Sequence, residues 1–255
     1  MEWKADKYLK FKEYRNLANI DLINAIKRHG NSYSSILDLG CGPGNSTTLL
    51  AQTFKDSKIL ALDNSQDMIN KAKNLKLKNC TFELCDIDKN LNTTNKYNLI
   101  FTNASIHWIK NQTKLLKNIT NMLEKNGIFA MQIPLDSKSI FHKSAKTLIK
   151  KYNTKIDRIF FSLPYAKYYD ILSKKCKVEM WESTYFHRLD DIDSILQWYE
   201  GSSLTSYTNK LEKDSQKDFL DELLKILSQK IKPQQNGDIL LPFPRLFIIS
   251  KYCFK

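Results

Sequence analysis

"SSILDLGCGPGNSTTLL" (residues 34–50) begins as an apolar strand, turns on three glycines and continues with a helical pattern. The glycines, Gly40, Gly42 and Gly44, follow the strand directly. Glycine accepts a positive φ at little cost and lets a ligand approach the main chain closely. A strand, a glycine turn and a helix in this order are typical of a site for a nucleotide-type ligand.

Strand and helix patterns continue to alternate beyond this stretch, with strands expected at 35–39, 58–63, 80–86, 97–105 and 128–134 and helices at 45–54, 65–75 and 112–127. Ser65 is the predicted N-cap of helix 65–75, and Gly127 is the predicted C-cap of helix 112–127. Continuous apolar strands between helices indicate a parallel sheet that is covered on both faces. We therefore predict an α/β, Rossmann-like fold.

The chain is expected to divide into three regions. Residues 1–30 predict a helical N-terminal cap, and residues 31–136 form the predicted ligand-binding core. Residues 137–255 are expected to complete the sheet and to carry helical lid insertions at about 137–165 and 190–236.

Two further strands are expected in the last region, at 177–189 and at 245–254. The polar segment between them has a helical period, which places four apolar residues on one face: Phe219, Leu223, Leu224 and Leu227.

The composition is that of a globular protein, with 42% apolar residues among 255. No apolar run is long enough to span a bilayer, and the first residues lack a secretory signal pattern, so a cytoplasmic protein is expected. The five cysteines show no metal-ligand spacing. No disulfide framework and no metal site are therefore predicted.

The formal charge of +13 raises the question of a nucleic-acid partner. Only five of the 40 basic residues are arginines, and the lysines are spread along the chain without a dense block. Dispersed lysines are typical of solvated helix faces. Nucleic-acid binding is therefore disfavoured, although it stays open as an alternative.

Two features of the glycine turn disfavour a pyrophosphate ligand. Asn45 occupies the position where a dinucleotide fingerprint has its third glycine, and Pro43 removes one N–H donor from the turn. Asp38, at the end of the first strand, suits a ligand that carries an ammonium group. S-adenosylmethionine (SAM) has an α-ammonium, a sulfonium, a ribose and an adenine.

Acids also follow the next two strands. A carboxylate at Asp63 can accept both ribose hydroxyls. Asp86 can accept from the adenine amine, with Ile87 beside the ring. Each acid alone has the alternative role of capping a turn, but the three acids together with the glycine turn predict a SAM site.

The fourth strand ends in "TNASIHWI" (102–109), where Asn103 can support cofactor or substrate and His107 and Trp108 can line the pocket or be structural. The predicted cofactor-binding residues are Asp38, Gly40, Gly42, Asn45, Asp63, Asn64, Met68, Asp86, Ile87, Asn103, Ala104 and Trp108.

The segments "DLGCGPG", "ALDNS", "CDI" and "NASIHW" resemble the class I SAM-dependent methyltransferases. A closer resemblance, to the trans-aconitate 2-methyltransferase family, rests on Trp3, Tyr8, Phe11 and Arg15 and on "YYDIL", "STYFH" and "QNGDILLPFPRLFII". It implies the seven-stranded class I methyltransferase sheet with an antiparallel last strand. It also implies methyl transfer from SAM to a carboxylate of trans-aconitate, giving a monomethyl ester and S-adenosylhomocysteine (SAH).

This chemistry needs no catalytic acid or base, because a carboxylate is ionised at neutral pH and the sulfonium is already activated. Positioning and exclusion of water are sufficient. Arginine is the better bidentate partner for a carboxylate, and the predicted substrate-binding residues are Arg15, Tyr168, Tyr169, His187, Arg188 and Arg245.

One departure from the family pattern concerns the substrate. Thr205 lies where the family tends to carry an arginine after Trp198. This keeps open a methyltransferase for another acid, such as the malonyl-carrier-protein thioester of biotin synthesis, whose carrier would need a basic docking patch. A catalytically silent SAM-binding module and a nucleic-acid methyltransferase also stay open as functions of this chain.

Overall fold

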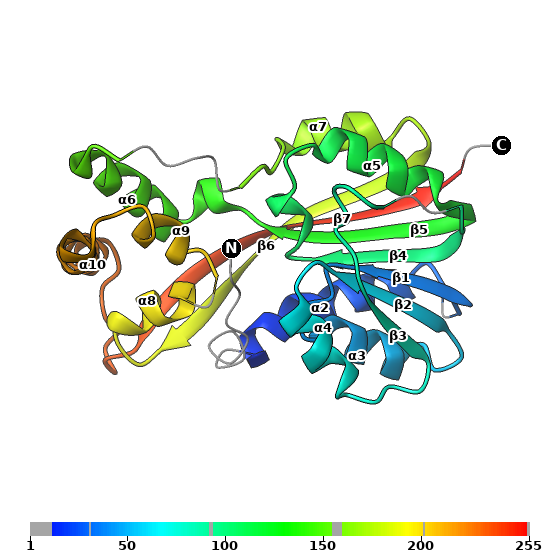
Figure 1. The fold of residues 1–255 in the computed structure, drawn as a ribbon, viewed down its shortest axis with the longest axis horizontal. Coiled ribbons are helices and arrows are strands. Elements are labelled where there is room, and N and C mark those ends of the chain that lie inside the picture. The colour runs from blue at the N-terminus through cyan, green and yellow to red at the C-terminus, as the bar shows by residue number, and fades with distance from the viewer. Residues whose placement is uncertain (1–11, 31, 92–93, 155–159, 201, 254–255) are drawn as a thin grey trace. The chain divides into compact units, whose positions relative to one another are not determined.

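The computed structural model describes residues 12–30, 32–91, 94–154, 160–200 and 202–253. Trp3, Tyr8 and Phe11, and with them the first part of the predicted N-terminal cap, lie outside the described residues. The strands are β1 (Ser35–Leu39), β2 (Lys58–Asp63), β3 (Cys80–Leu84), β4 (Tyr97–Asn103), β5 (Leu123–Pro134), β6 (Cys176–Leu189) and β7 (Ile239–Tyr252) (Figure 1). The α-helices are α2 (Lys12–Lys27), α3 (Asn45–Thr53), α4 (Gln66–Lys73), α5 (Gln112–Asn121), α6 (Ile140–Leu148), α7 (Tyr165–Leu172), α8 (Asp193–Glu200), α9 (Thr205–Thr208) and α10 (Lys213–Lys230). Short 3₁₀ turns are η1 (Ile106–Trp108), η2 (Asp136–Lys138) and η3 (Ile149–Tyr152).

All seven strands form one sheet in the order β3-β2-β1-β4-β5-β7-β6. β1 pairs in parallel with β2 on one side and with β4 on the other. The chain therefore reverses its direction of progress along the sheet beside β1. In open α/β sheets, ligands bind beyond the carboxyl ends of the strands at such a switch point. The predicted Rossmann-like fold is confirmed.

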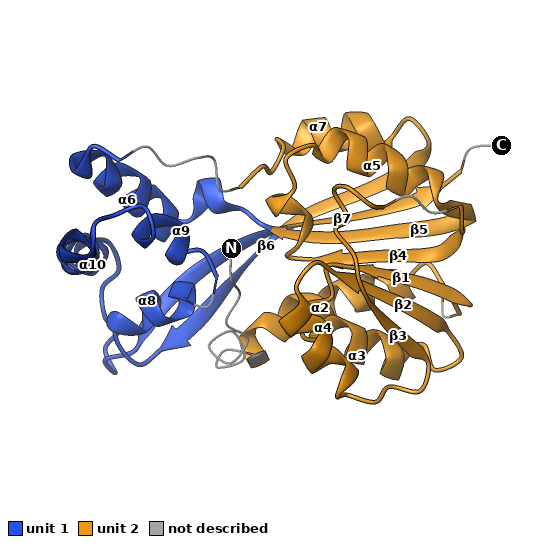
Figure 2. Ribbon diagram, in the orientation of Figure 1, with its two compact units in different colours: residues 1–11, 134–159, 183–245 blue, residues 12–133, 160–182, 246–255 orange. Residues whose placement is uncertain are grey.

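The chain divides into two compact units (Figure 2). Unit 2 comprises Lys12–Ile133, Phe160–Glu182 and Leu246–Lys255, and unit 1 comprises Met1–Phe11, Pro134–Ile159 and Ser183–Arg245. β6 runs from unit 2 into unit 1, whereas β7 runs from unit 1 into unit 2. These two strands are neighbours in the sheet and cross between the units in opposite senses. They are therefore antiparallel, and the sheet is mixed.

The regions predicted as lid insertions do not all belong to one unit. Residues 137–154 and 190–236 belong to unit 1, but residues 160–165 belong to unit 2. The role of these segments as a lid stays a prediction. Within the described residues, no helix has the length and apolarity that crossing a membrane requires.

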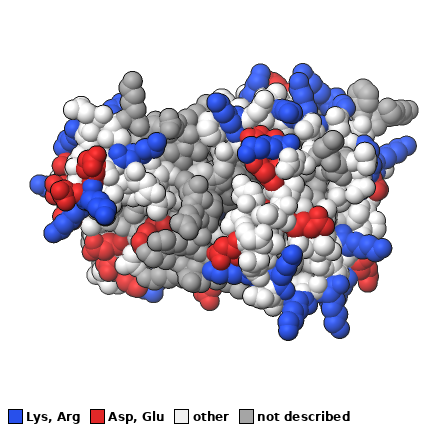
Figure 3. Space-filling view, viewed as in Figure 1, with Lys and Arg blue, Asp and Glu red and all other residues white. Residues whose placement is uncertain are grey.

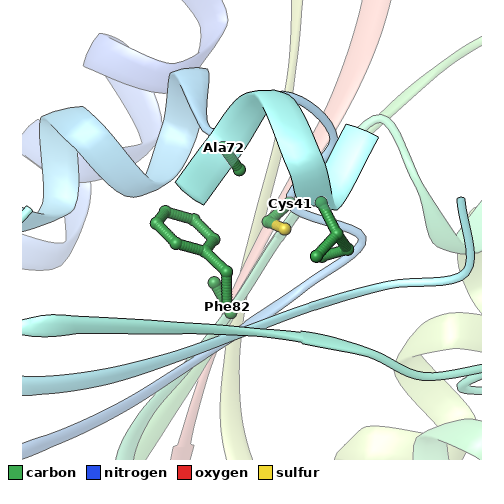
Figure 4. Packing of buried hydrophobic residues seen from close by; sticks show 5 residues of the cluster. Cys41, Ala72 and Phe82 are labelled. Atoms are coloured by element: carbon green, nitrogen blue, oxygen red, sulfur yellow. The ribbon is translucent and has the colours of Figure 1, made fainter. Parts of the chain in front are cut away.

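The core of unit 2 includes a cluster between α4 and the strands below it (Figure 4). Buried residues of the cluster are Cys41, Ala61, Ile69, Ala72 and Phe82. Ser65 caps α4, because its hydroxyl accepts the N–H of Met68 at 3.4 Å. The predicted cap is confirmed, and it fixes where the helix starts after β2.

The predicted helix at 112–127 is confirmed for residues 112–121, but its predicted end and the Gly127 C-cap are wrong. α5 ends at Asn121 and β5 begins at Leu123. Tyr97 pairs with Leu123 but Leu99 pairs with Ile128, so residues 124–127 form a bulge in β5. A Cβ on Gly127 would lie 3.0 Å from the Tyr97 carbonyl oxygen and 2.9 Å from that of Glu124. Gly127 therefore permits a close approach of backbone segments that a side chain would prevent. The predicted end was wrong because the helical spacing of apolar residues continues past the true end of the helix.

Other boundaries differ by a few residues. β3 ends at Leu84 and β4 at Asn103, two residues before each predicted end, and β7 begins at Ile239 instead of residue 245. On α10 the predicted apolar face is confirmed for Phe219, Leu223 and Leu227, which are buried, while Leu224 is half-buried.

Unit 1 is held together by aromatic packing and a buried polar network. Phe141 stacks on Tyr199 with ring centroids 3.7 Å apart. The His142 Nδ1 lies 3.1 Å from the Tyr207 hydroxyl, and the Ser139 hydroxyl lies 3.1 Å from that of Tyr199. Burial lowers the pKa of His142 to about 3, and the Lys146 ammonium acts in the same direction. His142 is therefore a neutral hydrogen-bonding group that joins α6 to α9.

Candidate cofactor site

The glycine turn lies at the carboxyl end of β1 and adopts a left-handed backbone. φ is +73° at Gly40, +55° at Gly42 and +91° at Gly44. A Cβ on Gly40 would lie 1.8 Å from the Ser105 hydroxyl oxygen and 2.4 Å from the Ser105 Cβ. A Cβ on Gly42 would meet no atom of the described residues within 4 Å. Gly40 is therefore required by the segment after β4, whereas Gly42 faces open space from which a ligand can approach.

This difference gives a test of the turn. Gly40→Ala should lower the free energy of unfolding by about 2–3 kcal/mol more than Gly42→Ala, because both add left-handed strain but only the first collides with Ser105. Thermal and urea unfolding of the two variants measure the difference. Adding Ser105→Gly to Gly40→Ala should restore part of the loss, and equal stability of the two alanine variants would contradict the packing described.

Asp38 is buried completely beneath the turn. Its Oδ2 accepts the hydroxyl of Thr47 at 2.7 Å and that of Ser46 at 2.9 Å. Its Oδ1 is also buried and has no hydrogen-bond partner among the described residues. Burial raises the pKa of Asp38 to about 6, against the two hydroxyl hydrogen bonds, and the negative field of Asp63 adds to the rise. One carboxylate oxygen is thus left for a donor from a ligand.

Asp63 ends β2 and connects it to the turn. Its Oδ2 accepts the Gly42 N–H at 2.8 Å and its Oδ1 accepts the Ser65 N–H at 2.9 Å. Burial raises the pKa of Asp63, although these backbone N–H groups lower it. Each oxygen keeps a further lone pair, so the carboxylate can accept two more donors. Asn64 beside it is exposed, and Met68 is buried in the first turn of α4.

Asp86 lies two residues beyond β3 and makes contacts within its own turn. Lys89 Nζ lies 3.1 Å from its Oδ2, and the Asp88 N–H donates to its Oδ1 at 3.0 Å. Partial burial would raise the pKa of Asp86, but the Lys89 hydrogen bond and the backbone N–H groups outweigh it, so the pKa lies below its ordinary value. Asp86 is thus ionised at neutral pH, and the neighbouring Ile87 is buried.

The segment after β4 packs against the glycine turn through Ser105. Ala104 has a φ of +50°, which is a strained conformation for a residue other than glycine. The Asn103 Oδ1 is buried and lacks a hydrogen-bond partner in the described part of the chain. Trp108 is half-buried and packs against Phe160, with ring centroids 4.7 Å apart. His107 is buried, and its ring lies 5.0 Å from that of Trp108 and 5.4 Å from that of Phe160, which indicates a packing role for this histidine.

Three predicted substrate residues belong to unit 2. Arg15 is half-buried on α2. Tyr168 is buried completely on α7, where its hydroxyl donates to Gln112 of α5 and accepts the Leu163 N–H. Tyr169 is exposed. The hydroxyl of Tyr168 therefore joins two helices, which makes it a weaker candidate for a substrate ligand than an exposed tyrosine.

The other three predicted substrate residues belong to unit 1 and have contrasting surroundings. Arg188 is exposed and pairs with Asp238 at 3.0 Å and with Asp190 at 3.6 Å. Arg245 is only 4% exposed, and its guanidinium carbon lies 4.7 Å from the centre of the Phe243 ring. His187 is buried completely and belongs to the same group of rings.

These rings form an aromatic cluster around Arg245, defined by Tyr185, His187, Trp198 and Phe243. His187 stacks on Trp198 with centroids 4.4 Å apart and lies 5.4 Å from Phe243. The guanidinium carbon of Arg245 lies 5.9 Å from the centre of the Tyr185 ring. A guanidinium stays charged when buried and binds carboxylates in a bidentate manner. Unit 1 thus holds a buried cation on an aromatic floor.

Comparison with known proteins places this geometry in a family. A family model described as "Methyltransferase domain" matches residues 31–196. Trans-aconitate 2-methyltransferase of Escherichia coli O157:H7 (strain EC4115 / EHEC) is 33% identical over 98% of both chains, and that of E. coli strain K12 / DH10B is 32% identical over the same shares. The chain belongs to the trans-aconitate 2-methyltransferase family of class I SAM-dependent methyltransferases.

Solved structures agree on the fold. The YcgJ protein of Bacillus subtilis is similar with a TM-score of 0.64 at 13% identity, over 92% of this chain and 98% of that one. Phosphoethanolamine N-methyltransferase 2 of Haemonchus contortus, solved with S-adenosyl-L-methionine, has a TM-score of 0.56 at 16% identity, over 92% of this chain and 52% of that one. The chain itself, as a member of this methyltransferase family, has SAM as its cofactor. The family resemblance identified from the sequence is confirmed.

The structure also brings residues to the turn that the sequence analysis passed over. Ser46 and Thr47 follow the glycines closely in the sequence, but only the fold shows that both hydroxyls donate to Asp38. Ser105 is the residue that makes Gly40 necessary. Asn45, a predicted cofactor residue at the start of α3, has a buried Nδ2 without a hydrogen-bond partner among the residues that the structure describes. Adjacency to the glycines was the only sequence signal at Ser46 and Thr47, and none linked Ser105 to the glycine turn.

Proposed function

We propose that this methyltransferase transfers the SAM methyl group to a carboxylate of trans-aconitate and releases the monomethyl ester and SAH. The observation that supports it most is Arg245, a buried guanidinium on aromatic rings, in a chain 33% identical to trans-aconitate 2-methyltransferase. A polycarboxylate needs a fixed cation, and a buried arginine provides one whose charge is poorly screened by water.

The cofactor is proposed to bind along the carboxyl ends of β1, β2 and β3. The Oδ1 of Asp38 would accept the α-ammonium, and Asp63 would accept the ribose hydroxyls with its remaining lone pairs. Asp86 and Ile87 would contact the adenine. Asn103, with its buried amide oxygen, would accept another donor of the bound molecules.

The reaction converts two charges into none. A carboxylate oxygen attacks the methyl carbon, the O–CH₃ bond forms as the S–CH₃ bond breaks, and the electron pair of that bond stays on sulfur. The reacting carboxylate and the sulfonium become a neutral ester group and a neutral thioether group, while the other two carboxylates of trans-aconitate keep their charge. Such a step is faster where water is excluded, because hydration stabilises the charged reactants more than the transition state, in which the two charges are already partly neutralised. The protein's task is therefore alignment and desolvation, without a general base.

Transfer to a different acid is the second candidate, and Thr205 is the observation that favours it. This residue begins α9, where the family tends to carry an arginine. A carrier-protein substrate would need a basic docking surface. The structure offers a groove of about 390 Å³ that Lys89 and Lys114 help to line, but Asp88 also lines it and Lys89 is paired with Asp86.

Nucleic acid stays the disfavoured substrate. On the face that Figure 3 shows, basic side chains are spread over the surface, with acidic side chains among them. Phosphate backbones are bound by contiguous positive surface. The cytoplasmic location stays a prediction of the sequence.

The deciding experiment incubates the purified protein with methyl-labelled SAM and a panel of trans-aconitate, cis-aconitate, citrate and malonyl carrier protein. We expect rapid, base-labile labelling of trans-aconitate, with at least tenfold slower labelling of the other acids. Faster transfer to another member of the panel would replace the substrate and keep the enzyme class. Labelling of none, with SAM still bound, would overturn the carboxylate proposal.

A further inference from the structure

The first turn of α3 contains three consecutive hydroxyl residues with two different roles. The hydroxyls of Ser46 and Thr47 both donate to the Oδ2 of Asp38, at 2.9 and 2.7 Å. The hydroxyl of Thr48 instead donates to the carbonyl of Gly44 at 2.8 Å. The N-cap of α3 is Gly44, which has no side chain to cap the helix. Ser46 and Thr47 therefore serve the carboxylate and not the helix end.

Two donors on the same oxygen leave the Asp38 carboxylate asymmetric. Its Oδ2 has both hydroxyls, whereas its Oδ1 is buried with no hydrogen-bond partner within the described residues. Hydroxyl donors stabilise the ionised form of a carboxylate and fix the plane of its two oxygens. We propose that Ser46 and Thr47 are positioning residues that hold Asp38 ionised and oriented, so that its Oδ1 receives the α-ammonium of SAM.

The proposal rests on the placement of the SAM ammonium at Asp38 given above, but not on the identity of the acid substrate. It explains how a carboxylate without exposure remains able to bind a cation. Burial favours the protonated form of Asp38, and the two hydroxyls oppose this. Without them, the carboxyl would bind a proton in place of the ligand at a higher pH.

Few of the described groups titrate near Asp38. Asp63 is the charged group whose field reaches it. Burial raises the pKa of the Cys80 thiol to about 11 and that of Cys41 well above its ordinary value, so both thiols are neutral below pH 8. α3 contains no titratable side chain. Asp38 and Asp63 are therefore the two carboxyls of this group whose raised pKa bears on ligand affinity as the pH falls.

The test measures dissociation constants by calorimetry from pH 5 to 7.5 for the full chain with two probes. SAH carries the α-ammonium. The second probe, 5′-methylthioadenosine, has the same thionucleoside but lacks the amino-acid chain that bears this ammonium. The Ser46→Ala/Thr47→Val double variant should bind SAH at least tenfold more weakly at pH 7.5 and 5′-methylthioadenosine within twofold of the original protein. The pH at which SAH affinity begins to fall should rise by about one unit, because the hydroxyls no longer lower the pKa of Asp38.

Matched variants separate positioning from damage to the helix. Thr48→Val removes a hydroxyl that does not touch Asp38, and Thr47→Ser keeps the one that does, so both should behave like the original protein. Asp63→Asn, measured over the same pH range, shows how much of the pH dependence of SAH affinity comes from Asp63. If the double variant is unfolded by circular dichroism, each single variant is used in its place.

Two results would overturn the proposal: wild-type SAH affinity with an unshifted pH profile, or equal weakening of both probes. If trans-aconitate is not methylated but the variants show the expected SAH affinities, the proposed substrate is wrong and the positioning role of Ser46 and Thr47 is still supported.

Discussion

Replacing Arg245 with alanine should lower kcat/KM for trans-aconitate by about 100-fold, while the dissociation constant of SAM changes less than twofold. The guanidinium is 4% exposed and lies on the Phe243 ring. Losing one partner of a buried, hydrogen-bonded charge pair costs roughly 2–5 kcal/mol, and the proposed partner here is a substrate carboxylate. Steady-state kinetics with both substrates varied, together with calorimetry for SAM, measure the two effects.

Arg188 provides the matched control for that experiment. It is exposed and already pairs with Asp238 and Asp190, so Arg188→Ala should change kcat/KM less than threefold. Arg245→Lys keeps the positive charge but lacks the planar guanidinium. Its kcat/KM for trans-aconitate should lie between those of Arg245→Ala and Arg188→Ala. If SAM affinity and acid kinetics decline together in Arg245→Ala, the arginine is structural and the proposed carboxylate site is lost.

Asp63→Ala should weaken SAM binding by about 1.5–3 kcal/mol, roughly 10- to 150-fold, because the cofactor loses a charged acceptor for its ribose hydroxyls. The carboxylate also fixes the turn through Gly42, at 2.8 Å. Calorimetry with SAM gives the total effect but does not separate these two contributions.

A double-mutant cycle separates them. A SAH analogue that lacks both ribose hydroxyls should bind the original protein about as weakly as Asp63→Ala binds SAH. Asp63→Ala should then bind the analogue as tightly as it binds SAH, because the contact with the ribose hydroxyls is already lost in this variant. Additive losses would mean that Asp63 acts on the turn alone and does not contact the ribose.

The sequence predicted most strands and helices because their signals are local. The cap at Ser65 and the apolar run of β2 can be identified without knowing any neighbour. The end of α5 could not be predicted in this way. The helical spacing of apolar residues persists through Met122 and Leu123, and only the pairing of Leu123 with Tyr97 places the end of the helix before them.

The candidate site shows the same limit. The glycines and the acids at the strand ends have a known spacing, and the fold places Asp38, Asp63 and the turn together. The pairing of two hydroxyls with Asp38 depends on how α3 turns onto β1. The stack of His187 on Trp198 joins residues from β6 and α8, which no pattern within one element reveals.

The prolines of β7 have a consequence for how an acid would be bound. Pro242 and Pro244 flank Phe243, the ring beneath Arg245, and the Pro244 carbonyl accepts the Leu135 N–H at 3.0 Å. Proline fixes its own φ and restricts the residue before it, so this segment has few conformations even in the unfolded chain. The arginine is thus presented on a backbone that is already rigid, and an acid that binds there loses little affinity to the ordering of the main chain.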